Sequence, residues 1–306
     1  MSSPRIAVGP RQGSFATDAV RDAGGTVVDI ADKPDAIVWL DPADVAGLAA
    51  WLSEAPDVRW VQLPFAGVEP VAEYGLLDEA RAWTCAKGSY AEPVAEHALL
   101  LALAGLRYLP TRVVARSWGK AAGTSLYDER VTILGGGGIT TSLLELLAPF
   151  RVEATVVRRQ PEPVPGAART VSIDELDDVL PGALVVFLAL ALTPQTTRII
   201  GPKALDRMDE RAWVVNVARG RHVDTDALVA ALDTGAIAGA ALDVTDPEPL
   251  PDGHPLWGRT NCIITPHTAD TWEMIVPLLA ARIAANVAHF AAGEPLEGPV
   301  DPAAGY

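Results

Sequence analysis

Arg130-Val-Thr-Ile-Leu-Gly-Gly-Gly-Gly-Ile-Thr-Thr141 is the stretch that indicates the fold most directly. Its first half has the apolar character of a buried strand, and a helical pattern follows the glycines. Because this turn carries no side chains, its backbone N–H groups can approach a pyrophosphate at the positive end of the helix. Gly135 and Gly137 take the first two positions of the G-x-G-x-x-G pattern, but Thr140 takes the third. We expect either a slightly displaced helix or a local compensation through Gly138.

Two arginines stand where the second strand of such a dinucleotide-binding unit ends. An acidic residue that accepts the ribose 2′-hydroxyl is expected roughly 20 residues after the turn. Arg158 takes that place, and Arg159 follows it. A guanidinium cannot accept a hydrogen bond from a hydroxyl, but it can pair with a 2′-phosphate. The pattern favours NADP(H) over NAD(H); the alternative is a plain tight turn and two exposed arginines.

Short apolar runs alternate with helical patterns along the whole chain, which is typical of parallel α/β layers. We expect strands at 5–9, 26–30, 36–40, 58–63, 83–86, 131–134, 153–157, 184–190, 213–217, 240–244 and 262–265. One long helix from 91 to about 117 separates two strand series, and a last helix covers roughly 271–292. For 306 residues, two α/β domains are the natural expectation.

The last helix is expected to return to the first domain, although periodicity alone does not establish this return. The predicted domains are therefore a discontinuous substrate domain, 1–90 plus 273–306, and a dinucleotide-binding domain, 91–272.

The composition excludes several classes of partner. A net charge of −15 repels polyanions, so neither nucleic acid nor an anionic membrane is an expected partner. No uninterrupted apolar stretch reaches the roughly 18 residues that span a bilayer, and the N-terminus begins directly with a strand pattern. Cys85 and Cys262 lie in apolar runs and are expected to be buried, reduced thiols. We expect a soluble, cytoplasmic protein.

Three downstream segments each place a polar side chain just after an expected strand. The segments are Val215-Asn-Val-Ala-Arg-Gly220, Leu242-Asp-Val-Thr-Asp-Pro-Glu-Pro-Leu250 and Ile264-Thr-Pro-His267. Because ligands bind outside the carboxyl ends of parallel strands, Arg219, Glu248 and His267 can converge there. Arginine binds a carboxylate bidentately, and a glutamate beside a histidine stabilises the imidazolium that donates a proton. Each residue alone has a structural explanation, but their joint occurrence favours catalysis.

Together with the glycine turn and Leu192-Thr-Pro-Gln-Thr196, these segments resemble the D-isomer-specific 2-hydroxyacid dehydrogenase family. The likeness covers nearly the whole chain, including Val94-Ala-Glu-His97, and is strongest from Gly135 to His267. The resemblance implies two Rossmann-like domains with parallel sheets, an active site in the interdomain cleft, and a homodimer. It also implies an NAD(P)H-dependent enzyme that reduces a 2-oxo acid to a D-2-hydroxy acid.

The same resemblance implies roles for individual residues. Arg219 would bind the substrate carboxylate and carbonyl, His267 would donate a proton to the carbonyl oxygen as hydride arrives, and Glu248 would orient His267. The expected cofactor-binding residues are Gly135, Gly137, Gly138, Ile139, Arg158, Arg159, Thr193, Ala218 and Asp243. The expected substrate-binding residues are Ala66, Gly67 and Val68, through their backbone, together with Phe65 and Trp272 from their positions. Simple packing is the alternative for Trp272.

The sequence leaves the substrate open among glyoxylate, hydroxypyruvate and larger aliphatic or aromatic 2-oxo acids. Leu40 and Asp41 stand where phosphoglycerate dehydrogenases tend to supply arginine, which makes a phosphorylated substrate less favoured. A second interpretation is a dinucleotide-sensing, corepressor-like binding protein on the same fold. A third is a methyltransferase that uses S-adenosylmethionine, in which the Arg–Glu–His set has no role.

The remaining histidines are expected to be structural. His97 is expected to be a packed or interface residue on the long helix, and His222, His254 and His289 are expected to be surface or loop residues. None of them has metal-ligand spacing to a cysteine or carboxylate, so no metal is expected.

Overall fold

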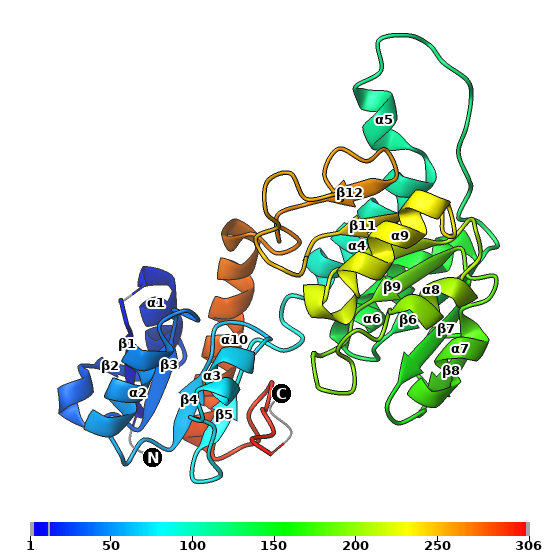
Figure 1. Ribbon diagram of the computed structural model, residues 1–306. Coiled ribbons are helices and arrows are strands. Elements are labelled where there is room, and N and C mark those ends of the chain that lie inside the picture. The colour runs from blue at the N-terminus through cyan, green and yellow to red at the C-terminus, as the bar shows by residue number, and fades with distance from the viewer. Residues whose placement is uncertain (1–2, 12, 304–306) are drawn as a thin grey trace. The chain divides into compact units, whose positions relative to one another are not determined.

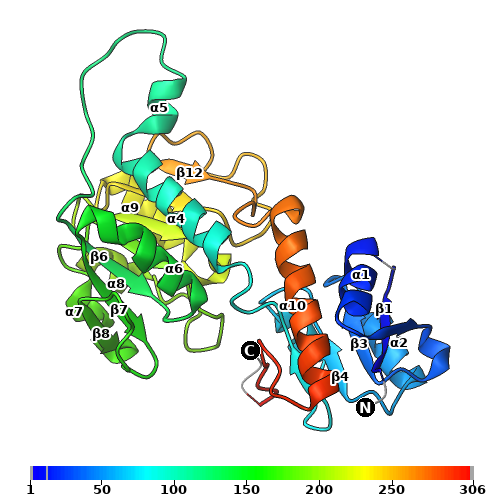
Figure 2. The ribbon, with the colours of Figure 1, turned by 180° about the vertical axis from the view of Figure 1, so that it is seen from behind.

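The computed structural model describes residues 3–11 and 13–303, and the chain divides into two compact units. Unit 1 comprises Met1–Tyr90 with Thr271–Tyr306, and unit 2 comprises Ala91–Asp270. Each unit is built on a sheet whose neighbouring strands all run parallel (Figures 1 and 2). The predicted fold class of two parallel-sheet α/β regions is therefore confirmed.

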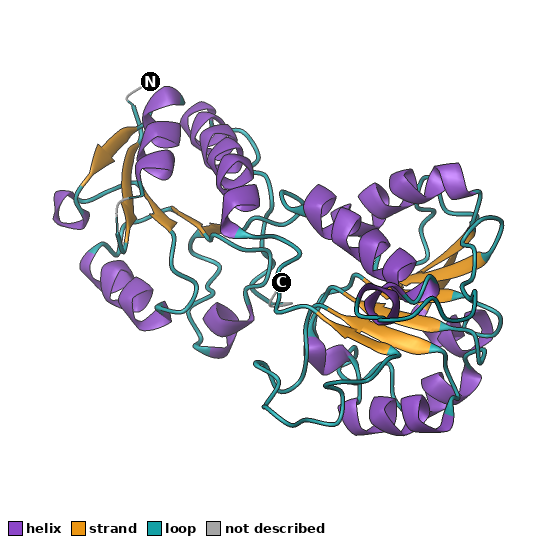
Figure 3. Ribbon diagram, turned by 90° about the horizontal axis from the view of Figure 1, so that it is seen from above, coloured by secondary structure: helices purple, strands orange, loops and turns teal. Residues whose placement is uncertain are grey.

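The sheet of unit 1 has five strands in the order β2-β1-β3-β4-β5. The strands are β1 (Arg5–Gly9), β2 (Thr26–Val28), β3 (Ala36–Trp39), β4 (Trp60–Gln62) and β5 (Ala82–Thr84). The helices are α1 (Ser14–Asp22), η1 (Ile30–Asp32), α2 (Val45–Glu54), α3 (Glu69–Glu73) and α10 (Trp272–Ala292). Because β3 and β4 are buried along their whole length, both faces of the sheet need a cover of helices, which Figure 3 shows. Helices α1 and α10 pack together, and α2 contributes Leu48 and Leu52 to the core with Trp39.

The sheet of unit 2 has seven strands in the order β12-β11-β10-β9-β6-β7-β8. The strands are β6 (Arg130–Leu134), β7 (Glu153–Arg158), β8 (Arg169–Ser172), β9 (Val185–Leu188), β10 (Trp213–Asn216), β11 (Gly239–Leu242) and β12 (Cys262–Ile264). The chain enters at β6, runs outward through β7 to β8, and returns on the other side of β6 with β9. Such a reversal of strand order opens a crevice at the carboxyl ends of the strands, where ligands bind in open α/β sheets.

Helices cover both faces of this second sheet. The helices of this unit are α4 (Ala91–Leu106), α5 (Leu109–Val113), α6 (Gly138–Leu147), η2 (Ala148–Phe150), η3 (Ile173–Glu175), α7 (Leu176–Val179), α8 (Pro202–Arg207), η4 (Gly220–His222) and α9 (Thr225–Thr234). Helices α4 and α6 lie side by side on one face (Figure 2), and α7, α8 and α9 lie on the other (Figure 1).

Two elements differ from the sequence prediction. The long helix expected at 91–117 ends at Leu106, because Tyr108 adopts a left-handed backbone with φ of 52° and Pro110 lies in the first turn of the short helix α5. Strand β8 was not expected at all. Only Val171 of its four residues is buried, so this edge strand carries no apolar run to reveal it.

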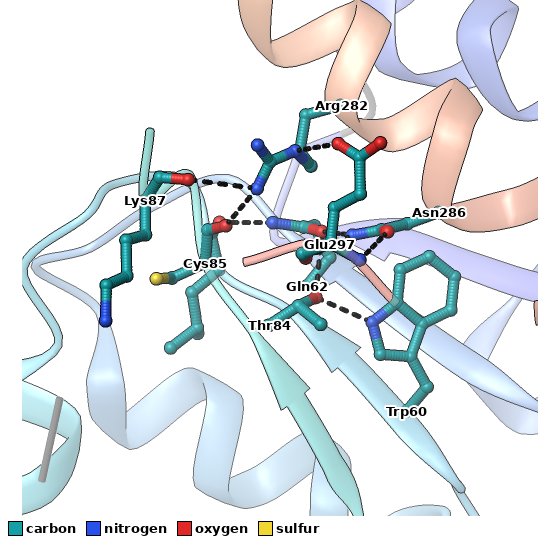
Figure 4. A network of polar contacts seen from close by, with 9 residues as sticks. Trp60, Gln62, Thr84, Cys85, Lys87, Arg282, Asn286 and Glu297 are labelled. Carbon is teal, nitrogen blue, oxygen red and sulfur yellow. Dashed lines mark hydrogen bonds and ion pairs between the residues drawn. The ribbon is translucent and has the colours of Figure 1, made fainter. Parts of the chain in front are cut away.

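A buried polar network joins α10 to the sheet of unit 1 (Figure 4). Nδ2 of Asn286 donates to Oε1 of Gln62 at 2.8 Å and to the carbonyl O of Glu297 at 3.0 Å. Oδ1 of Asn286 accepts from N of Glu297 at 2.7 Å. On the sheet, Oγ1 of Thr84 donates to the same Gln62 oxygen at 2.8 Å and accepts from Nε1 of Trp60 at 2.8 Å. The helix therefore returns to this sheet through polar contacts between residues far apart in the chain.

Helix α10 is long and apolar enough to cross a membrane by length and composition alone. Its polar residues nevertheless bond within unit 1, and Nη1 of Arg282 donates to the carbonyl O of Cys85 at 3.1 Å and of Lys87 at 3.2 Å. Ile275, Leu279, Ile283 and Val287 on this helix are buried. The helix has the contacts of a core helix of a folded α/β unit.

Replacing Asn286 by alanine is expected to destabilise unit 1 by about 3 kcal/mol, because the buried side chain of Gln62 and the backbone of Glu297 each lose a hydrogen-bond partner. Denaturant unfolding of the variant measures this loss. Asn261→Ala in unit 2 is the matched control, since its side chain makes one long hydrogen bond of 3.4 Å. Equal stability of the two variants would show that the network does not hold α10.

Candidate active site

Gly135 follows β6 at a place where no side chain fits. Its φ is 110°, and a Cβ there would lie 2.1 Å from the carbonyl O of Ala189, which follows β9. Oγ1 of Thr140 donates to the carbonyl O of Gly135 at 2.9 Å, and Thr140 is fully buried. The Thr140 hydroxyl thus bridges the turn, and the expected helix displacement or compensation through Gly138 stays a prediction.

Helix α6 begins at Gly138, directly after Gly137 at the N-cap position. No described side chain caps this helix end, and both glycines are exposed. The first N–H groups of a helix without such a cap are available to an anion, and the helix dipole adds positive potential there. Ile139 lies half-buried in the same turn. The structure of the turn fits a pyrophosphate group.

Arg158, the last residue of β7, lies against the glycine turn. A Cβ built on Gly136 would lie 2.9 Å from Cδ and 3.1 Å from Nε of Arg158. Its Nη2 lies 3.6 Å from Oε2 of Glu162, and the Arg158 side chain is 29% exposed. Arg159 is exposed beside it. Gly136 was not singled out from the sequence, although it is part of the run of four glycines. Because Gly136 has no side chain, it leaves room for Arg158.

Arg219 leaves the sheet after β10, and the buried Asn216 at the end of that strand holds its backbone. Nδ2 of Asn216 donates to the carbonyl O of Arg219 at 2.9 Å, and Oδ1 accepts from N of Ala218 at 3.0 Å. Gly220 packs against the loop after β11, since a Cβ there would lie 1.9 Å from the carbonyl O of Thr245. The loop of Arg219 therefore touches the loop that carries Glu248.

Glu248 and His267 pair directly. Oε1 of Glu248 lies 2.7 Å from Nδ1 of His267, and Oε2 accepts from N of Thr245 at 3.3 Å. His267 adopts a φ of 52°, which is uncommon for a residue with a Cβ, and its N donates to the carbonyl O of Asp243 at 2.8 Å. When Nδ1–H donates to the carboxylate, Nε2 is the nitrogen that can exchange a proton with a ligand.

The carboxylate of Asp243, an expected cofactor residue, lies inside unit 2 with 1% of the side chain exposed. It accepts from Oγ1 of Thr265 at 2.5 Å and from N of Thr268 and Ala269 at 2.9 and 3.0 Å. Burial raises the pKa of Asp243, but the hydrogen bonds from the His97 side chain and these three groups outweigh it and lower the pKa to about 2. The charged Asp243 carboxylate therefore anchors the loop after β12.

Asp270 is a carboxyl of unit 2 whose charged surroundings the sequence did not reveal. Burial raises the pKa of its carboxyl above the usual range. The charge of His267 lowers this pKa, that of Asp243 raises it, and that of Arg219 lowers it. One carboxyl group thus experiences the charges of both Arg219 and His267, which places the two predicted catalytic residues in one electrostatic environment.

The loop after β9 carries Thr193, another expected cofactor residue. N of Thr193 donates to Oγ1 of Thr196 at 2.8 Å, which closes a turn beyond the carboxyl end of β9. Nε2 of His222, in η4, lies 3.2 Å from the carbonyl O of Leu190 in this loop. The expectation that His222 is a surface or loop residue is wrong, because its side chain is fully buried under the loop.

The expected substrate residues of unit 1 follow β4, at residues 65–68. Ala66 is exposed and Val68 is buried. The Phe65 ring meets the Tyr90 ring edge-on at 6.2 Å, and the Tyr90 hydroxyl donates to the carbonyl O of Pro64 at 2.6 Å. These contacts of Tyr90 hold the start of the loop.

Trp272, the first residue of α10, is 50% exposed and meets Phe15 edge-on at 5.7 Å. Phe15 was not singled out from the sequence, because it lies in α1, far from Trp272 along the chain. The two rings form an aromatic pair of unit 1.

Comparison with known proteins identifies the family. Residues 97–269 match the model of the D-isomer specific 2-hydroxyacid dehydrogenase, NAD binding domain. A Corynebacterium melassecola protein, "Uncharacterized protein in proB 3'region", is 40% identical over 299 residues, covering 95% of this chain and 96% of its own. The chain belongs to the D-isomer specific 2-hydroxyacid dehydrogenase family. The sequence-based resemblance is confirmed.

Solved structures of the family have the same fold. A D-isomer specific 2-hydroxyacid dehydrogenase from Xanthobacter autotrophicus Py2, in complex with NADPH and MES, has a TM-score of 0.86 at 28% identity, covering 99% of this chain and 100% of that one. An NADPH-dependent glyoxylate/hydroxypyruvate reductase from Sinorhizobium meliloti, in complex with NADP and sulfate, has a TM-score of 0.82 at 24% identity, covering 99% and 100%. This dehydrogenase chain is thus an oxidoreductase with a nicotinamide dinucleotide as its cofactor.

The buried His222 makes the stability of this dehydrogenase sensitive to acid. Burial and then the charge of Arg219 lower the pKa of His222 from 6.5 to about 4. Between those two values the unfolded chain binds a proton that the folded chain does not, so stability falls as the pH falls through this window. From pH 7.5 to 5 the free energy of unfolding should drop by about 2 kcal/mol more in the wild type than in His222→Gln.

Denaturant unfolding of both proteins at the two pH values measures the difference. The comparison at equal pH cancels the titration of other groups, including Asp270, whose raised pKa acts in the opposite direction. The glutamine side chain retains an N–H group that can donate to the carbonyl O of Leu190. An identical pH dependence of the two proteins would contradict the neutral state of His222.

Proposed function

We propose that this protein reduces a 2-oxo acid to a D-2-hydroxy acid, with Arg219, Glu248 and His267 as its catalytic residues. The observation that carries the proposal is the 2.7 Å pair of Glu248 Oε1 and His267 Nδ1 at the carboxyl edge of the sheet of unit 2. A nicotinamide dinucleotide, when bound, would supply the hydride. The remaining chemistry, which is proton transfer and charge stabilisation, belongs to side chains of this chain.

His267 holds the proton that the reaction consumes. Glu248 accepts the Nδ1–H and stabilises the imidazolium, so the proton on Nε2 is the one donated to the carbonyl oxygen of the substrate. In the reverse direction the neutral ring accepts that proton through Nε2. The hydrogen bond from N of Thr245 to Oε2 keeps the Glu248 carboxylate oriented toward the ring.

Arg219 is the proposed clamp for the substrate carboxylate, because a guanidinium binds a planar carboxylate bidentately. Asn216, at the end of β10, holds the backbone of Arg219, so the guanidinium extends from a backbone position that is fixed to the sheet. We propose that the backbone of Ala66, Gly67 and Val68 also binds this carboxylate. Phe65 and Trp272 are the proposed apolar contacts of the substrate side chain.

We propose NADP(H) as the favoured cofactor. The pyrophosphate would bind at the turn of Gly135, Gly137 and Gly138, with Ile139, Thr193, Ala218 and Asp243 in its surroundings. Arg158 lies against Gly136 at the end of the second strand, with Arg159 beside it, and supports a site for a 2′-phosphate. The Xanthobacter protein, which is 28% identical to this chain, was solved in complex with NADPH, and this supports the proposal.

A cytoplasmic homodimer is the proposed working form. Exposed apolar side chains on α5 and the segment after it support association: Val113, Val114 and Trp118 are 73%, 75% and 100% exposed. The segment extends away from the sheet of unit 2 in Figure 1. Cys85 and Cys262 are buried free thiols, which agrees with a reducing compartment.

Absorbance of NADPH and NADH, followed with glyoxylate, hydroxypyruvate, pyruvate, 2-oxoisocaproate and phenylpyruvate, tests the activity. We expect oxidation with at least one acid, and a loss of about a hundredfold or more in kcat in His267→Gln because its proton donor is gone. His254→Gln, a histidine outside the proposed site, should keep the wild-type kcat. Cofactor binding without turnover by the wild type would instead favour a dinucleotide sensor.

The cofactor preference has its own test. Arg158→Ala should raise KM for NADPH about tenfold or more and leave KM for NADH nearly unchanged, because one charged partner of the 2′-phosphate is lost. Arg169→Ala is the matched control, since this arginine pairs with Glu175 at the edge strand β8. An unchanged ratio of the two KM values in Arg158→Ala would remove Arg158 from the cofactor site.

A further inference from the structure

His97 on α4 reaches the anchor of the proposed catalytic loop. Its Nε2 lies 3.0 Å from Oγ1 of Thr265 and 3.3 Å from Oδ1 of Asp243, and 15% of its side chain is exposed. Helix α4 packs against β11 and β12, the strands that end just before Asp243 and Thr265. His97, expected to be a packed or interface residue, thus touches both residues that follow these two strands.

The hydrogen atoms in this cluster can be assigned from its chemistry. Asp243 is a carboxylate with only acceptor oxygens, and Thr265 lies 2.5 Å from it, so the threonine hydroxyl donates its one proton to Asp243. The Thr265 oxygen therefore faces His97 as an acceptor. Both neighbours of Nε2 are acceptors, which means that Nε2 carries a proton and is shared between them.

Asp243 in turn holds the 265–269 loop at several points. Its carboxylate accepts from N of Thr268 and N of Ala269, and its carbonyl O accepts from N of His267. The last bond fixes the backbone of His267 at its positive φ of 52°. When a buried carboxylate loses one hydrogen-bond donor, its charge is less well stabilised. The position of the 265–269 loop therefore depends on every donor to Asp243.

We propose that His97 is a positioning residue for proton transfer: its Nε2–H completes the shell of Asp243 and thereby holds the 265–269 loop with His267 in place. His97 acts through Asp243 and Thr265 and has no required contact with substrate or cofactor. The inference rests on the proposed catalytic role of His267. Its local part, the anchoring of the loop, is independent of turnover.

Two variants separate the donor from the bulk of the ring. His97→Leu removes the donor and keeps an apolar side chain, whereas His97→Gln retains an N–H group at a similar reach. In His97→Leu we expect amide hydrogen exchange within 265–269 to rise about tenfold, and kcat to fall about tenfold with the KM of the 2-oxo acid nearly unchanged. His97→Gln should stay within about threefold of the wild type in both measurements.

Leu101→Ala on the same helix is the control for a merely structural effect. Leu101 is buried, and its truncation should lower the melting temperature without changing exchange in 265–269 or kcat below the transition. The proposal is overturned if His97→Leu leaves exchange in the loop unchanged, or if Leu101→Ala or His97→Gln accelerates it equally. A wild type without reductase activity refutes the proposed function instead, and the exchange measurement still decides the role of His97.

Discussion

Close approach of backbone to backbone at the carboxyl edge of the seven-stranded sheet is the constraint on which the site depends. Gly135 lies against the carbonyl O of Ala189, and Gly220 lies against that of Thr245. In both places a Cβ would push apart two loops that follow neighbouring strands of the sheet. These two approaches bring the turn at Gly135 to the loop after β9, and the loop of Arg219 to the loop of Glu248. The chemistry proposed for the site follows from this arrangement of strand ends.

Behind this edge, buried polar groups keep the loops in place. Asp243 retains its charge inside unit 2 because donors surround it, and it anchors the loop of His267. His222 is buried without a charge and supports the loop after β9. Asn286 has the corresponding part in unit 1, where it joins α10 to the sheet. Asp243 and Asn286 are satisfied by partners from distant segments, which makes the local geometry specific. The side chain of His222 has such a partner at Nε2, whereas its buried Nδ1 has none among the described residues.

The fold was largely predictable because its signals are local. Apolar runs of strand length indicated every strand except β8, whose single buried residue leaves no pattern. The start of α4 was predictable from its composition, but its end was not, because the left-handed Tyr108 interrupts a sequence that would otherwise continue as a helix. Asp270 and Asn216 in unit 2 and Phe15 in unit 1 carried no sequence signal, since a carboxyl, amide or ring looks like any other before its neighbours are known.

The sequence by itself determined those features of the protein that depend on interactions between residues close together in the chain. It placed a glycine turn between a strand and a helix, an arginine at the end of the next strand, and Arg219, Glu248 and His267 after three further strands. The tertiary structure decided which of these groups meet and what holds them: the Thr140 hydroxyl across the turn, Arg158 against Gly136, and His97 on Asp243. The physical reason is that hydrogen bonding and burial depend on the order of strands in space, which periodicity along the chain does not encode.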